Sequence, residues 1–230
     1  MSAIINTDVL LIGDGMSGMS AAIVASQSGV RCKLVEKGPH LGGSSRYSAG
    51  MFWAPKNIKT FLEIIPLGEP SLQTKWHSDN PSAVRWMKEQ GVPMQPRFEP
   101  VMSIGHAFPI DMSVWMEIAE RLIRSNSKSE ILFRTSAVEL ITETPVVEGS
   151  RVTGAILRQS DGSIVHVNAK AVIIGTGGFA GSPQLVFQYI GSGADNIFVR
   201  ANHYSTGDGL RLAQRVGAGT SRGMSTQANF

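Results

Sequence analysis

The order of predicted elements over the first 36 residues constrains the fold of this chain more than any other feature. Residues 9–12 form a short apolar run, and the sequence Gly-Asp-Gly-Met-Ser-Gly follows it directly at residues 13–18. An alanine-rich stretch at 19–28 predicts a helix, and an apolar stretch at 30–35 predicts a second strand that ends at Glu36. A strand, a glycine-rich turn, a helix, a strand and an acid in this order form the unit that binds an ADP moiety at a parallel sheet.

Each part of this unit has a physical task. Gly13 permits the tight turn, Gly15 lets the backbone approach a pyrophosphate, and Gly18 lets the helix pack close to the strand. The helix N-terminus offers free N–H groups and the positive end of its dipole to the phosphates. Glu36 is expected to accept hydrogen bonds from ribose hydroxyls. The motif is informative because the strands and the acid surround it.

Composition describes an ordinary globular chain of 230 residues, with 42% hydrophobic and 17% charged residues. No apolar run approaches the roughly 18 residues that span a bilayer. The N-terminus has no basic segment, so we expect no cleavable signal peptide and a cytoplasmic location. The net charge of +3 comes from scattered residues, which argues against a nucleic-acid partner. The single cysteine, Cys32, is interpreted as a small buried apolar residue.

The rest of the chain predicts some helices and a run of antiparallel strands. We expect helices at 80–90, 111–124 and 210–216, with a partly irregular stretch at 56–72. We expect strands at 131–134, 137–141, 152–157, 163–167 and 171–174, with an Asp-Gly hairpin turn at 161–162. A nicotinamide-binding domain would instead continue with alternating strands and helices. The order favours an α/β, Rossmann-like FAD-binding domain, with a parallel sheet carrying helices on one face and a β-meander on the other.

Four blocks of sequence carry a resemblance to a known family. They are residues 13–18 with Ala21 and Ala22, residues 35–50 around Gly42-Gly43-Ser44-Ser45, the stretch AVIIGTGGF at 171–179, and Ser-Thr-Gly-Asp-Gly at 205–209. In this order they resemble the N-terminal FAD-binding part of the fumarate reductase/succinate dehydrogenase flavoprotein family, which includes 3-ketosteroid dehydrogenases. The resemblance implies one FAD-binding domain over 1–220 and the start of a cap domain at 221–230.

The resemblance also implies which residues hold FAD. It predicts cofactor contacts from Gly13, Gly15, Met16, Ser17, Gly18, Glu36, Lys37, Gly42, Gly43, Ser44, Ser45, Ser48, Ala49, Gly50, Met51, Ala137, Val138, Thr176, Gly177, Gly178 and Asp208. Asp208 has a second interpretation as the N-cap of the helix that follows it.

One departure from the family pattern concerns how FAD is attached. Some family members bond the flavin to a histidine just before the Ser-Ala block, where this chain has Ser44 and Ser45. A serine cannot form a histidyl linkage, so we expect dissociable FAD. His106 lies far along the chain and is interpreted as a hydrogen-bonded structural histidine.

The catalytic residues stay unassigned. In the family, the substrate clamp and proton donor come from the cap and from a C-terminal segment, and this sequence stops about where the cap would begin. Tyr47, Tyr189, Arg200, His203 and Tyr204 are candidates by chemistry alone, without a supporting motif. Metal-ligand clusters, a Gly-x-Ser-x-Gly elbow and a P-loop ending are all absent from the sequence.

The leading hypothesis is an FAD-dependent oxidoreductase, or its FAD-binding portion. The resemblance implies hydride transfer between flavin N5 and a substrate carbon, with oxidation or reduction of a CH–CH bond. It implies a small-molecule substrate and an unknown electron donor or acceptor. The pattern from Gly42 to Pro55 leans toward the ketosteroid dehydrogenases. The alternatives are a non-catalytic FAD-binding module or truncated subunit completed by a partner chain, and an NAD-only dehydrogenase if the β-meander is wrong.

Overall fold

A computed structural model describes residues 3–101, 104–143, 150–191, 193, 198–199 and 202–221. The chain divides into two compact units, of which the first comprises Met1–Tyr47 with Ala119–Gly219 and the second Ser48–Ile118 with Thr220–Phe230. Helix α4 (Met112–Arg124) contributes residues to both units. Apart from Ser221, the residues expected to begin a cap lie outside the described part of the chain.

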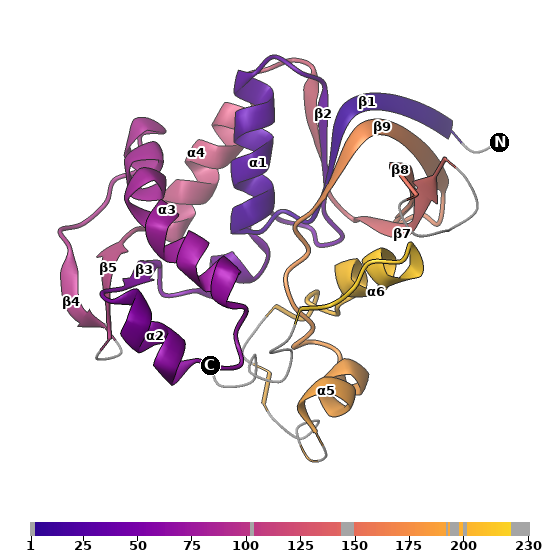
Figure 1. The fold of residues 1–230 in the computed structure, drawn as a ribbon. Coiled ribbons are helices and arrows are strands. Elements are labelled where there is room, and N and C mark those ends of the chain that lie inside the picture. Colours follow the sequence, from indigo (N-terminus) through magenta and orange to yellow (C-terminus); the bar gives the residue numbers. More distant parts are fainter. Residues whose placement is uncertain are drawn as a thin grey trace. The chain divides into compact units, whose positions relative to one another are not determined.

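The first unit is built on a six-stranded sheet (Figure 1). Its strands, in spatial order, are β6 (Ser129–Leu132), β2 (Cys32–Val35), β1 (Ala3–Ile12), β9 (Ile164–Ile174), β8 (Val152–Gln159) and β7 (Thr135–Thr142). The first four strands are parallel, and β8 and β7 continue the sheet in antiparallel pairing. The predicted parallel sheet and the predicted β-meander are therefore both present.

Strand β9 belongs to both parts of the sheet. Its first half pairs antiparallel with β8, from Arg158 opposite Ile164 to Gly154 opposite Asn168. The same strand pairs parallel with β1, with Ile12 opposite Ile174. Figure 1 shows how β9 curves between these two partners. The expectation of separate strands at 163–167 and 171–174 was wrong, because the polar residues between them face solvent on one continuous strand.

The two faces of β1 pack against different layers. Leu10 and Ile12 belong to a buried cluster with Leu157 of β8 and Val167 of β9. Side chains alternate along a strand, so the fully buried Leu11 points to the opposite face. Helix α1 (Met16–Gln27) packs against β1 and β2 there. A helix on one face and the β-meander on the other confirm the predicted fold class.

Helices α5 (Pro183–Ile190) and α6 (Asp208–Arg215) follow β9. Leu212 of α6 packs into the core cluster on the meander side of β1. Helix α5 was not predicted, although its start carries ordinary signals. Ser182 accepts a hydrogen bond from the N–H of Leu185 at 3.4 Å, and Pro183 occupies the first turn.

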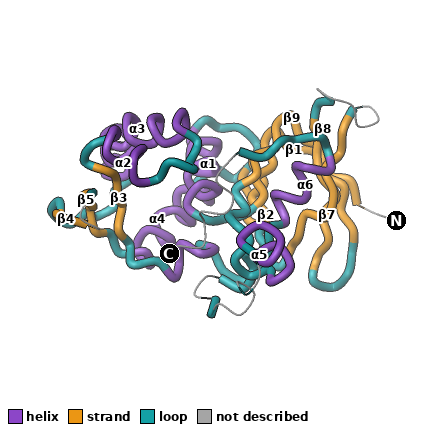
Figure 2. Tube along the Cα trace, turned by 60° about the horizontal axis from the view of Figure 1, so that its bottom comes forward, coloured by secondary structure: helices purple, strands orange, loops and turns teal. Residues whose placement is uncertain are grey.

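The second unit contains a three-stranded antiparallel sheet in the order β3 (Met51–Pro55), β5 (Gly105–Pro109) and β4 (Phe98–Val101). Helices α2 (Ile58–Ile64) and α3 (Pro70–Glu89) lie beside β3 (Figure 2). Trp53 of β3 packs against Phe61 of α2 and Trp76 of α3, with ring centroids 5.9 and 5.1 Å apart. These aromatic side chains bind the two helices to the sheet.

The predicted start of the helix at 80–90 was wrong, and an unpredicted helix lies within the stretch 56–72 that was expected to be partly irregular. Residues 58–64 form α2, whose first turn is capped by Asn57 accepting from the N–H of Thr60 at 3.1 Å. Helix α3 begins at Pro70, and Pro81, which was interpreted as lying in its first turn, is inside it. Ser82 donates to the carbonyl oxygen of Asp79 at 2.8 Å near this proline.

Gly154 provides a test of the β8–β9 pairing. A Cβ atom at this position would lie 1.9 Å from the carbonyl oxygen of Val167, whereas a Cβ at Gly219 would meet nothing within 4 Å. We expect Gly154→Ala to lower the free energy of unfolding by about 1–3 kcal/mol, since backbone cannot move aside cheaply. Urea unfolding followed by circular dichroism measures this, with Gly219→Ala as the control. Equal stability of the two variants would contradict the pairing.

Candidate functional site

A cavity of about 450 Å³ lies in the first unit at the carboxyl ends of β1, β2 and β9. The predicted site residues that line it are Gly13, Gly15, Met16, Ser17, Glu36, Lys37, Gly43, Ser44, Ser45, Ala137, Thr176, Gly177 and Asp208. Open α/β sheets bind their ligands at this edge. The structure thus brings together residues that are far apart in the sequence.

Eight predicted residues are placed elsewhere. Gly18, Gly42, Val138 and Gly178 belong to the first unit without lining the cavity. Ser48, Ala49, Gly50 and Met51 belong to the second unit. Gly50 has a local structural task there, because its φ is +68° and a Cβ would lie 2.1 Å from the carbonyl oxygen of Ile110.

The glycine-rich turn is a close backbone crossing. Gly13 has a φ of +93°, and a Cβ on it would lie 2.6 Å from the carbonyl oxygen of Gly175. A Cβ on Gly18 would lie 1.9 Å from the carbonyl oxygen of Gly13, so Gly18 lets α1 approach the turn. At Gly15 the nearest atom to such a Cβ is 3.9 Å away. Gly13 and Gly18 are thus required by packing, while Gly15 leaves open space at the cavity.

The N-terminus of α1 faces this open space. Gly15 is the N-cap residue, and Met16 and Ser17 of the first turn line the cavity. The N–H of Met16 donates to Oγ of Ser45 at 3.2 Å. The first N–H groups of a helix have no partner within the helix, and together with its dipole they form a site for an anion.

Glu36 is fixed at the end of β2. Its side chain is buried, with 8% of the residue exposed. Oε1 accepts from the N–H of Gly38 at 2.6 Å, and Oε2 accepts from the N–H of Asp14 at 3.3 Å. The backbone is held as well, because Glu36 accepts from the N–H of Thr135 at 2.9 Å. The carboxylate is thus a pre-oriented acceptor in the cavity wall.

Lys37 and Asp208 connect β2 to α6. The Nζ atom of Lys37 lies 2.6 Å from Oδ2 of Asp208 and 2.5 Å from Oγ1 of Thr206. Thr206 also donates to Oδ1 of Asp208 at 2.9 Å. The N-cap of α6 is Gly207, which has a φ of +75°, so the interpretation of Asp208 as the N-cap was wrong. Asp208 is the first helical residue, and its carboxylate belongs to the cavity wall.

Several residues of the cavity were not predicted from the sequence. Asp14, Ser20, Thr135, Asn202 and Ser205 all line it. Asp14 occupies a variable position of the glycine motif, and an acidic residue at that position was the sequence feature that could have identified it as a site residue. Burial raises the pKa of Asp14 to about 8, and the neighbouring Glu36 adds to this shift. Ser205 comes into the site through its Oγ, which is 2.8 Å from Oγ of Ser44.

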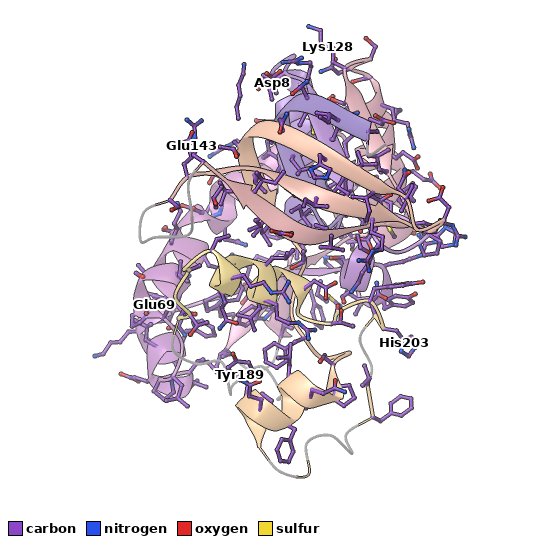
Figure 3. The ribbon with its side chains drawn as sticks, turned by 90° about the vertical axis from the view of Figure 1, so that its right-hand side faces the viewer. Asp8, Glu69, Lys128, Glu143, Tyr189 and His203 are labelled. Carbon is purple, nitrogen blue, oxygen red and sulfur yellow. The ribbon has the colours of Figure 1, made fainter. Side chains whose placement is uncertain are left out.

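Of the residues that were candidates for catalysis by their chemistry alone, some lie at the cavity and others do not. Tyr204 lines the cavity. His203 is exposed, and Tyr189 packs against Phe179 with ring centroids 5.5 Å apart (Figure 3). Tyr47 is 67% exposed. Arg200 lies outside the described residues.

His106 lies on β5 in the second unit, with its ring edge-on to Phe108. Burial and the charge of Arg97 lower its pKa. Its Nδ1 is buried and has no hydrogen-bond partner among the described residues, so the expected hydrogen bond at this nitrogen is not seen. Cys32 is fully buried, as expected, and burial raises the pKa of its thiol to about 11.

Within the described residues, no helix is both long and apolar enough to cross a membrane. The same part of the chain contains no group of three histidine, cysteine, aspartate or glutamate side chains that could hold a metal ion.

Comparison with curated proteins gives relatives along most of the chain. The NADH:fumarate oxidoreductase of Klebsiella pneumoniae is 30% identical over 235 residues, covering 93% of this chain and 25% of that protein. The vinyl phenol reductase of Lactiplantibacillus plantarum is 27% identical, covering 92% of this chain and 46% of that protein. A 3-oxosteroid 1-dehydrogenase of Mycobacterium tuberculosis is 48% identical over 50 residues, or 22% of this chain and 9% of that protein. The chain therefore spans less than half the length of these relatives.

Solved structures share the fold. An open conformation of a flavocytochrome c3 fumarate reductase has a TM-score of 0.79 and 22% identity, covering 94% of this chain and 41% of that one. The 3-ketosteroid-Δ4-(5α)-dehydrogenase of Rhodococcus jostii RHA1 has a TM-score of 0.76 and 20% identity, covering 94% and 55%.

The family described as FAD dependent oxidoreductase matches residues 8–178, which include the glycine-rich turn, Glu36 and the whole of β9. With the relatives above, this match shows that the chain belongs to the FAD-dependent oxidoreductase family and covers the FAD-binding portion of its fumarate reductase/succinate dehydrogenase flavoproteins.

Proposed function

We propose that the chain binds FAD without a covalent bond in the cavity of the first unit. We further propose that the complete protein uses this FAD to oxidise or reduce a CH–CH bond of a small molecule. When bound, the flavin supplies hydride transfer between its N5 atom and a substrate carbon. The residues of this chain bind and orient the cofactor.

The observation that carries the proposal is the pairing of two features at one cavity edge. The first turn of α1 offers N–H groups to a pyrophosphate, and Gly15 leaves room for its approach. Glu36 presents a carboxylate that two backbone N–H groups already orient. A ligand with a pyrophosphate next to a ribose matches both features, and the ADP half of FAD is such a ligand.

Further cavity residues match the adenine, which is the remaining part of the ADP half of FAD. Ser136 and Ala137 at the start of β7 line the cavity beside Glu36, where backbone groups would meet the adenine. The ion pair between Lys37 and Asp208 joins the segment that follows β2 to the start of α6. We infer that this ion pair holds the two walls of the cavity together around the cofactor.

The serines in place of the family histidine support a non-covalent cofactor. The hydroxyl of Ser45 accepts a hydrogen bond from the N–H of Met16, and the hydroxyl of Ser44 contacts that of Ser205. Both hydroxyls therefore serve the structure of the cavity wall. Neither side chain has the ring nitrogen that a histidyl–flavin bond requires.

The activity of the complete protein rests on its relatives. Reductases of fumarate and of vinyl phenol act on substrates that contain a carbon–carbon double bond, which supports chemistry at a CH–CH bond. A second candidate function is a non-catalytic FAD-binding module or subunit completed by a partner chain. It is supported by the coverage of 25% and 46% of these relatives. Catalytic residues stay unassigned under both, and the electron partner and the cytoplasmic location stay predictions.

The visible spectrum of the purified chain tests the proposed cofactor. We expect a flavin spectrum, either directly or after reconstitution with FAD. On denaturation the yellow colour should pass through an ultrafiltration membrane, because no covalent bond retains it. Colour that stays with the polypeptide would contradict non-covalent binding. Protein that stays colourless after incubation with FAD would contradict the proposed site.

Gly15→Ala tests where the pyrophosphate binds. Gly15 has a φ of −62°, which alanine adopts readily, and a new Cβ would meet nothing closer than 3.9 Å. We expect the apoprotein to stay folded and to lose at most about 1 kcal/mol of stability, because alanine is a poorer N-cap residue than glycine. The Kd for FAD should rise at least tenfold, or about 1.4 kcal/mol, because the methyl group occupies the approach of the pyrophosphate. Quenching of flavin fluorescence measures the Kd, with Gly219→Ala as the control. A wild-type Kd for Gly15→Ala would place the pyrophosphate elsewhere.

A further inference from the structure

Asp14 is a buried acid in the middle of the glycine-rich turn. None of its surface is exposed, and both side-chain oxygens are buried without a hydrogen-bond partner among the described residues. A buried carboxylate normally has a cation or several donors as partners, because removing a charge from water is costly. The resemblance to known flavoproteins assigned no role to this residue.

The groups around Asp14 do not compensate a negative charge. At the end of β2, Glu36 is itself acidic and accepts from the N–H of Asp14. The nearby ammonium of Lys37 is bound by Asp208 and Thr206. On the loop after β2, the N–H groups of Gly42 and Gly43 favour the charged form, but their effect is smaller than that of burial and of Glu36.

Among the described residues that line the cavity, the first turn of α1 and the end of β9 add no charged side chain. The first turn of α1 contributes Met16 and Ser17, and the end of β9 continues into residues 175–177, which are glycine and threonine. Apart from the ion pair of Asp208 with Lys37, the site therefore holds two carboxyl groups and no free cation among its described residues. Two neighbouring buried carboxyl groups do not both ionise readily, and one of them keeps a proton.

The hydrogen bonds decide which carboxyl group keeps the proton. Glu36 accepts from the N–H of Gly38 at 2.6 Å and, more weakly, from the N–H of Asp14 at 3.3 Å, and such bonds stabilise a negative charge. Neither side-chain oxygen of Asp14 has a hydrogen-bond partner among the described residues, and the nearby N–H groups of Gly42 and Gly43 offset only part of the effect of burial. We propose that Asp14 is kept as a neutral acid, so that Glu36 alone presents a negative charge to the ribose and no second negative charge faces the pyrophosphate. The pKa of Asp14, raised to about 8 by burial and by Glu36, supports this assignment.

The proposal rests on FAD binding in this cavity and makes that binding depend on pH. Below pH 8 Asp14 is neutral, and the site at the N-terminus of α1 accepts the two negative charges of a pyrophosphate. Above this pH Asp14 ionises, so the free protein must take up a proton before it binds FAD well. The Kd should therefore rise as the pH increases, approaching about tenfold per pH unit for a single linked proton.

Fluorescence titration of the 230-residue chain with FAD between pH 6 and pH 9.5 tests this dependence. We expect a wild-type Kd that is flat at low pH and rises through the region near pH 8. Asp14→Asn keeps the shape and neutrality of the protonated acid, so its Kd should stay near the low-pH wild-type value at every pH. Asp161→Asn makes the same chemical change at an exposed hairpin residue and should keep the wild-type rise.

Equal pH dependence of wild-type and Asp14→Asn protein would overturn the proposal. A flat wild-type titration with tight binding throughout would overturn it while leaving the FAD site standing. Failure of the wild-type chain to bind FAD at any pH would instead remove the proposed function.

Two further measurements test the proposal, and the first of them needs only the wild-type chain. Calorimetry of FAD binding to the wild-type chain at pH 8.5, in two buffers of different ionisation enthalpy, should detect proton uptake, and zero uptake would contradict the proposal. In the apoprotein, a pKa raised from 3.8 to about 8 on folding means that the stability contributed by Asp14 falls as the pH rises through this range. The melting temperature of Asp14→Asn relative to wild type should therefore increase from pH 5 to pH 8, and a constant difference would contradict a buried neutral Asp14.

Discussion

The close approach of three backbone segments at the carboxyl ends of β1, β2 and β9 is the constraint on which the rest of the first unit depends. The N–H of Gly13 donates to the carbonyl oxygen of Val35 at 2.8 Å, and the N–H of Gly175 donates to that of Ile12 at 2.7 Å. Side chains at Gly13 or Gly18 would enter the backbone of the crossing. This crossing fixes where α1 begins, and the N-terminus of α1 fixes where an anion can bind.

The electrostatics of the cavity follow from the same arrangement. The helix N-terminus favours negative charge, yet Asp14 and Glu36 place two acids beside it. Glu36 accepts hydrogen bonds from two backbone N–H groups, whereas the side-chain oxygens of Asp14 are buried without a hydrogen-bond partner among the described residues, and Gly42 and Gly43 offset only part of this burial. A proton on Asp14 resolves the conflict, because it leaves one acceptor for ribose hydroxyls and little repulsion for phosphates. The cavity is then suited to a dinucleotide only while Asp14 keeps its proton.

Local sequence patterns predicted those parts of the fold in which elements that are consecutive in the sequence also pack against each other. The β1–α1–β2 unit and the hairpin turn at Asp161 are of this kind, and most predicted cofactor residues in the first unit line one cavity. The three-stranded sheet of the second unit was missed, because its strands are short and come from separated segments. Pro81 concealed the length of α3. The buried state of Asp14 depends on segments around residues 36 and 42, which no local pattern reveals.

A crystal structure of this chain grown with FAD tests the central claim most directly. We expect pyrophosphate oxygens within about 2.7–3.2 Å of backbone nitrogens in the first turn of α1, with a ribose hydroxyl at a similar distance from the Glu36 carboxylate. An ADP moiety bound away from both groups would contradict it, even if the chain were fully loaded with flavin.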